Sequence, residues 1–167
     1  MRRRVLAFDP IAEADRQWRA HGWEGAARGM SVVTSIMRVH QLLQARVDAT
    51  LHPFGLTFAR FELLRLLAFS RAGALPLGKI GDRLQVHPAS VTNAVDRLER
   101  AGLVRRRPQE DDRRGVLAEI TRAGREVVEA ATAELNTMVF ADTGLSPHDQ
   151  EELFRILRKV RHAAGDF

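Results

Sequence analysis

The sequence predicts a mainly α-helical fold that carries one small β-hairpin. Ala, Leu, Arg and Glu, which favour helices, dominate the 167 residues, and apolar residues recur at spacings of three and four along most of the chain. The exception lies at 103–120, where two short runs flank a polar tip, which is the pattern of a hairpin. The apolar fraction, 45%, is enough for a folded core.

The stretch 76–102 predicts two short helices on either side of a tight turn. Ile80 and Leu84 lie four residues apart on the first helix, and a break follows at 85–88. The second helix has its own apolar stripe, formed by Val91, Val95 and Leu98. Gly102 ends this helix, because glycine takes a positive φ without a Cβ clash. Two such helices form a helix-turn-helix, and the hairpin behind them makes it a winged helix.

Several short motifs in this region are similar to those of the MarR family of bacterial transcription regulators. They are Val91-Thr92-Asn93, Asp96-Arg97-Leu98-Glu99, Ala101-Gly102-Leu103-Val104, Asp111-Asp112-Arg113-Arg114-Gly115, Ile120-Thr121 and Gly124. The hairpin motif is the most specific of these, since residue types and spacings agree across the whole element. With the flanking helices, the resemblance extends from Met30 to Ala164.

The second helix of the motif is the candidate recognition helix for the major groove, which is about 12 Å wide. Because its apolar stripe must face the core, the residues between the apolar positions point elsewhere. The candidates for base or phosphate contacts are Ser90, Thr92, Asn93 and Arg97. Asp96 is expected to orient an arginine or to cap a polar network instead. Arg105, Arg106 and Arg107 alternate along one strand, so they cannot all face DNA.

The hairpin tip supplies the second set of DNA-binding candidates, Asp112, Arg113 and Arg114. The resemblance implies that Arg114 enters the minor groove while Asp112 holds its guanidinium group. A narrow minor groove concentrates negative potential, and arginine loses its hydration more readily than lysine.

The flanking segments predict further helices. They lie at 9–21, with Asp9 as cap and Trp18 on the apolar face; at 30–51; from Thr57 to about Ser70; from the cap Thr121 to about Phe140; and from Ser146 to near Ala164. Gly22, Gly25 and Gly29 are expected to separate the first two. The expected stripe of the fourth is Val127, Ala130, Ala131, Leu135 and Met138.

This pattern gives an N-terminal extension with a short helix (1–29), a DNA-binding winged helix-turn-helix (57–121) and a helical dimerisation region (30–56 and 122–167). The resemblance implies that the terminal helices form the interface of a homodimer. The resemblance therefore implies a regulator, by analogy a repressor, that binds palindromic double-stranded operator DNA and responds to a small anionic or phenolic effector.

The candidate effector-binding residues are Trp18, Arg38 and Glu62. One MarR subgroup that responds to urate has an N-terminal helix with a tryptophan, as here at Trp18, and an aspartate where Glu62 stands. That subgroup also has an arginine at the position of Ala94, so this sequence departs from its pattern.

Other functions find less support in the sequence. There is no cysteine, no phosphate-binding loop and no pair of histidines four residues apart, so no catalytic residue, cofactor or metal is predicted. The alternatives are an architectural protein that binds DNA without sequence preference and a winged-helix module that binds proteins. The net charge of +5 favours a polyanionic partner. No apolar run approaches the roughly 20 residues of a membrane span, so a cytoplasmic location is expected.

Overall fold

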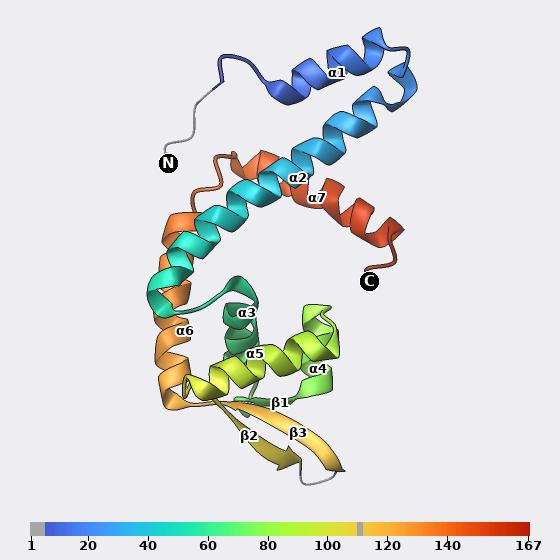
Figure 1. The fold of residues 1–167 in the computed structure, drawn as a ribbon. Coiled ribbons are helices and arrows are strands. Elements are labelled where there is room, and N and C mark those ends of the chain that lie inside the picture. The colour runs from blue at the N-terminus through green and yellow to red at the C-terminus, as the bar shows by residue number, and fades with distance from the viewer. Residues whose placement is uncertain (1–5, 110–111) are drawn as a thin grey trace. The chain divides into compact units, whose positions relative to one another are not determined.

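The structure is a computed structural model that describes residues 6–109 and 112–167, without the side chains of 112–114. The chain forms two compact units, Met1–Asp48 and Ala49–Phe167 (Figure 1). Most of the described residues are helical and the strands form one small sheet, which confirms the predicted fold class. No helix in the described ranges is both long and apolar enough to cross a membrane.

The first unit contains α1 (Pro10–Ala20) and most of α2 (Glu24–Leu51). The Asp9 carboxylate accepts a hydrogen bond from the Ile11 amide at 2.8 Å, and Pro10 occupies the first position of α1, both as predicted. A hydrogen bond of 3.2 Å from the Ser31 hydroxyl to Asp15 ties α2 to α1.

The predicted start of the long helix is wrong. Helix α2 begins six residues before Met30, and of the three glycines expected to break the pattern only Gly22, with φ +82°, forms a turn. Gly25 and Gly29 lie inside α2. A glycine costs a helix about 1 kcal/mol relative to alanine, which a helix of this length tolerates.

The second unit contains the helix-turn-helix and the wing. Helices α4 (Leu77–Leu84) and α5 (Pro88–Arg100) form the helix-turn-helix, and the turn between them starts at Gln85 with φ 54°. Gly102 takes φ +73° after α5, as predicted. Strands β2 (Val104–Gln109) and β3 (Asp112–Ile120) then form the hairpin, which extends beyond the helices of this unit in Figure 1.

The sheet has a third strand that the sequence did not reveal. Strand β1 (Ala74–Pro76) pairs antiparallel with β3, so the strand order is β1-β3-β2. Its central residue, Leu75, lies opposite Ala118 and is buried. Three residues between a turn and a helix carry too short a pattern to be recognised, and this strand exists because β3 provides its hydrogen-bond partners.

Helix α3 (Phe58–Phe69) is the buried centre of the second unit, as predicted. It contacts α4, α5, α6, β1 and β3. Its side chains Leu63, Leu64 and Leu67 are at most 1% exposed. Thr57 occupies the cap position, but its hydroxyl makes no capping hydrogen bond and instead accepts one from Arg60 Nε at 3.2 Å. A short 3₁₀ turn, η1 (His52–Phe54), precedes this helix.

Helix α6 (Arg122–Leu135) continues into the π-helical turn η2 (Asn136–Phe140). The Thr121 hydroxyl caps it by accepting from the Gly124 amide at 3.0 Å, which confirms the predicted cap. The predicted stripe is wrong in part, because α3 covers a neighbouring face. The buried residues are Gly124, Val128, Ala131, Leu135 and Val139, whereas Met138 is 55% exposed.

Helix α7 (Pro147–Ala163) starts as predicted, with the Ser146 hydroxyl accepting from the Asp149 amide at 3.2 Å. None of its residues is buried in the single chain.

Candidate nucleic-acid interface

The recognition helix α5 has the buried face that the sequence predicted. Val91, Val95 and Leu98 are at most 2% exposed. The four predicted contact residues, Ser90, Thr92, Asn93 and Arg97, are all exposed. The structure therefore places them where they can reach a ligand, and their contact with DNA stays a prediction.

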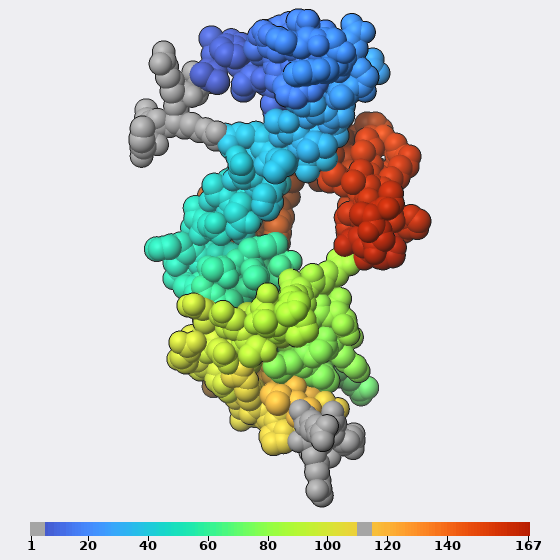
Figure 2. Space-filling view, turned by 45° about the vertical axis from the view of Figure 1, so that its right-hand side comes forward, coloured from blue at the N-terminus to red at the C-terminus, as the bar shows by residue number. Residues whose placement is uncertain are grey.

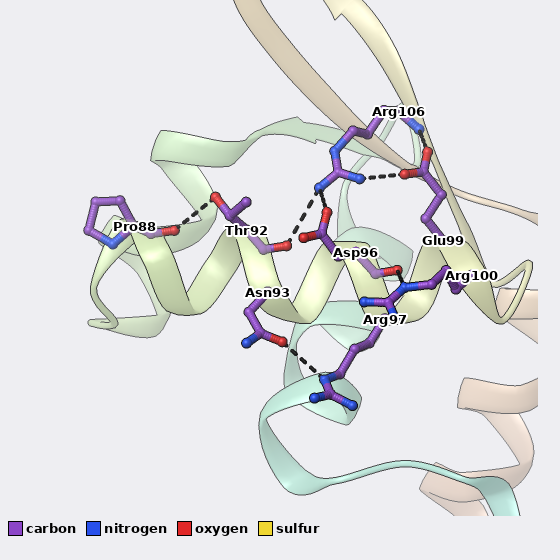
Figure 3. A network of polar contacts seen from close by, with 8 residues as sticks. All are labelled: Pro88, Thr92, Asn93, Asp96, Arg97, Glu99, Arg100 and Arg106. Carbon is purple, nitrogen blue, oxygen red and sulfur yellow. Dashed lines mark hydrogen bonds and ion pairs between the residues drawn. The ribbon is translucent and has the colours of Figure 1, made fainter.

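Three of these side chains form hydrogen bonds within their own helix. The Thr92 hydroxyl donates to the Pro88 carbonyl at 3.1 Å, and Arg97 Nε donates to Asn93 Oδ1 at 3.0 Å (Figure 3). The Asn93 amide nitrogen and the ends of the Arg97 guanidinium group have no acceptor among the described residues, which suits contacts to base edges or phosphates.

Arg106 of β2 clamps the wing to α5. Its guanidinium group forms ion pairs with Asp96 and Glu99, and its amide donates to the Glu99 carboxylate at 2.9 Å. Figure 3 shows Arg106 reaching over the face of α5 that carries these two acids and Thr92. The expectation that Asp96 orients an arginine is therefore confirmed. The Arg106 amide and guanidinium donors both bind the Glu99 carboxylate and lower its pKa.

The importance of Arg106 was missed from the sequence alone. The available signal was a pair of acids three residues apart, Asp96 and Glu99, on a helix that is followed by a strand with three consecutive arginines. Because β2 turns back beside α5, the central arginine of the three faces both acids at once. The clamp fixes the orientation of the hairpin relative to the recognition helix.

The other two strand arginines lie on the opposite face of the sheet, which confirms the predicted alternation. Glu119 of β3 accepts hydrogen bonds from Arg105 Nη2 at 2.8 Å and from Arg107 Nη1 at 3.2 Å. These bonds, chiefly those from Arg105, lower the pKa of Glu119 to about 2 although partial burial opposes the shift. Both arginines thus share one carboxylate within the wing.

The wing-tip candidates fall where the structure gives no side chains. The backbone of Asp112, Arg113 and Arg114 belongs to β3, and their side chains lie outside the described residues. Their roles, including the Asp112–Arg114 pair, stay predictions.

The three effector candidates belong to different units. In the first unit, the Trp18 ring meets the Trp23 ring edge-on, with centroids 5.3 Å apart, and Arg38 donates to Gln41 Oε1 at 2.9 Å. In the second unit, Glu62 of α3 is half-buried, and this burial raises the pKa of its carboxyl group. Glu62 has no hydrogen-bond partner among the described residues. Within the same ranges, no group of three or more His, Asp or Glu side chains is arranged to hold a metal.

Comparison with known proteins identifies the family. The MarR family profile matches residues 56–116, which include the buried helix α3, the helix-turn-helix and most of the wing. The crystal structure of Sco5413, a MarR family transcriptional regulator from Streptomyces coelicolor, shares 54% identity and superimposes with a TM-score of 0.76, covering 84% of this chain and 97% of that one.

Two further proteins show the same relationship. Sco3205, a MarR family regulator from the same organism solved in complex with DNA, is 28% identical with a TM-score of 0.70, over 79% of this chain and 85% of that one. The HTH-type transcriptional repressor Mb2911 of Mycobacterium bovis is 30% identical over 75% of this chain and 89% of its own length. This chain belongs to the MarR family, whose members are DNA-binding transcriptional regulators and not enzymes.

Proposed function

We propose that the protein is a sequence-specific transcriptional repressor that binds a palindromic operator as a homodimer. The observation that carries this proposal is the clamped pair of DNA-binding elements. Helix α5 presents Ser90, Thr92, Asn93 and Arg97 on its surface, and Arg106 holds the wing at a fixed orientation beside it. The DNA complex of Sco3205 and the description of Mb2911 as a repressor support this assignment.

The homodimer is supported by apolar side chains that a single chain leaves exposed. They lie on α2 (Val32, Val33, Ile36, Met37, Val39, Leu42 and Leu43) and on α7 (Leu153, Phe154, Ile156 and Val160), and each is between 41% and 64% exposed. Such apolar clusters on one chain mark interfaces between proteins. We assign dimerisation to residues 30–56 and 122–167, DNA binding to 57–121, and leave 1–29 as an extension of the dimer region.

A two-fold dimer presents two copies of α5 and two wings. Each α5 would enter a major groove and each wing the neighbouring minor groove, with Arg114 inserted and held by Asp112. The centres of the two half-sites are then about 10 bp apart. Because the partner is chromosomal DNA, we expect the protein in the cytoplasm.

A small anionic or phenolic effector would release the DNA. Glu62 supports this part of the proposal, because it is a half-buried carboxyl group without a hydrogen-bond partner among the described residues, and its burial raises its pKa. Trp18 and Arg38 of the first unit stay separate candidates for contacts to the effector. Titration of candidate organic acids and phenolics into the protein–DNA complex tests this part, and release of DNA by none of them would count against it.

The central experiment measures binding to DNA from upstream of the protein's own gene. We expect it to bind at least about a thousandfold more tightly than random DNA at the same salt concentration. Arg114→Ala should weaken binding strongly, whereas Arg122→Ala, which removes an exposed arginine from the start of α6, should not. Equal affinity for both DNAs would favour an architectural protein, and no affinity for either would favour a protein-interaction module.

A further inference from the structure

A groove lies between the start of α3 and one edge of the recognition helix. It has a volume of about 350 Å³. The residues that line it are Thr57, Ala59 and Arg60 from α3 and its cap, and Ser90, Asn93, Ala94 and Arg97 from α5. All of them are polar, basic or small, and none is acidic. In Figure 2 the blue-green surface around the start of α3 adjoins the yellow-green surface of α5.

Neither arginine of this groove is neutralised by a carboxylate among the described residues. Arg60 Nε donates to the Thr57 hydroxyl at 3.2 Å, and Arg97 Nε donates to the Asn93 side-chain oxygen at 3.0 Å. Both partners are uncharged. The strand arginines 105, 106 and 107 differ, because each forms an ion pair with an acid. The groove thus keeps two positive charges for a ligand from outside.

The groove lies on the opposite edge of α5 from the wing clamp. Ser90, Asn93, Ala94 and Arg97 follow one another at helical spacings along this edge. Thr92, Asp96 and Glu99 follow the other edge and meet Arg106. Figure 3 shows Asn93 and Arg97 directed away from Arg106, towards the ribbon where α3 begins.

The size of the major groove decides what these edges would meet. A helix with its side chains is about 10–12 Å across, and the groove is about 12 Å wide. When α5 points its outer face at the base edges, its two sides therefore lie against the two sugar-phosphate backbones. The clamp edge offers an arginine that is already paired with two acids. The α3 edge offers two unpaired guanidinium groups.

We propose that Arg60, together with Arg97, binds one backbone phosphate of DNA in each half-site. This inference rests on the proposed function and adds a DNA contact from α3, an element outside the helix-turn-helix and the wing. A phosphodiester fits because its two free oxygens accept hydrogen bonds from separate guanidinium groups. Since all phosphates are alike, Arg60 contributes affinity and register on the duplex and leaves the choice of sequence to α5.

The salt dependence of binding provides the first test. Each neutralised phosphate contributes about 0.9 to the slope of log K against log salt concentration. Because Arg97 still faces the phosphate in Arg60→Ala, a dimer that loses the two Arg60 contacts has a slope lower by up to about 1.8. The ratio of the wild-type affinity to the Arg60→Ala affinity should then shrink by up to about 12-fold between 50 and 200 mM KCl. Arg60→Lys keeps the charge and should keep the wild-type slope. Arg122→Ala is the control for loss of a positive charge away from the groove and should also keep it.

These measurements are made by fluorescence anisotropy on the operator and on random DNA. Arg60→Ala should weaken both complexes by a similar factor. An unchanged slope, a loss confined to the operator, or the same loss in Arg60→Lys would each overturn the proposal. Thermal unfolding of each variant confirms that it is folded before binding is compared.

A methylphosphonate scan gives the second test, because it removes the charge of one phosphate at a time. A methylphosphonate at one position in each half-site should weaken binding by the wild type more than binding by Arg60→Ala, since both changes remove the contact of Arg60 with that phosphate. If the two changes were additive at every position, Arg60 would not bind a phosphate. A wild type without preference for the operator would instead refute the proposed function, and the salt slope on random DNA would still report on Arg60.

Discussion

Replacing Gly124 by alanine tests how tightly α6 is fixed to the start of the wing. A Cβ atom at this position would lie 2.1 Å from the Leu103 carbonyl oxygen and 2.9 Å from Ile120 Cγ1. Contacts below 3.0 Å are essentially never seen, so Leu103 would have to move by at least the difference, 0.9 Å. The atom that must move belongs to the backbone, and the same oxygen accepts a hydrogen bond from the Thr121 amide at 3.0 Å.

The expected change in stability follows from three contributions. Overpacking costs about 1–3 kcal/mol, and weakening the Thr121 hydrogen bond adds about 1 kcal/mol. Alanine favours the helix over glycine by about 1 kcal/mol, which offsets part of the loss. We therefore expect Gly124→Ala to lower the free energy of unfolding by about 1–3 kcal/mol. Urea denaturation at one fixed protein concentration measures this value.

The matched control is Gly78→Ala in α4, where an added Cβ meets no atom within 4 Å. The same chemical change should stabilise the protein there by up to about 1 kcal/mol, because only the helix preference acts. A Gly124→Ala variant as stable as the wild type would refute the close approach of α6 to Leu103.

Two further predictions concern the wing. Arg106→Ala should weaken operator binding on the order of tenfold or more, because Asp96 and Glu99 would then face the phosphates without their cation. Adding Asp96→Asn and Glu99→Gln to that variant should restore much of the binding, and an Arg106→Ala protein with wild-type affinity in a titration would contradict the clamp. Glu119 should stabilise the fold above pH 4.5 and lose this contribution as the pH falls towards its folded-state pKa of about 2, because that pKa lies below the ordinary one. The difference in unfolding free energy between the wild type and Glu119→Gln should therefore shrink across that range in acid, and a difference independent of pH would argue against the Arg105–Glu119 bonds.

The sequence by itself determined the features that depend on near neighbours. Asp9, Thr121 and Ser146 cap their helices through bonds that span two or three residues, so each cap was visible in a short stretch of sequence. The stripe of Val91, Val95 and Leu98 fixed the buried face of α5, because a helix returns to the same side every three or four residues. The recognition helix and its exposed candidate residues followed from that stripe.

Only the tertiary structure decided the features that depend on distant partners. Strand β1 exists because β3 pairs with it, and α3 selects Val128 over Val127 as the buried side of α6, although both are apolar and lie side by side in the sequence. The clamp of Arg106 and the groove beside Arg60 likewise join residues of separate elements. Only the folded chain brings together the atoms that form hydrogen bonds between strands, ion pairs between elements and close packing. These atoms lie far apart along the chain, so a local pattern of residues does not predict which of them will meet.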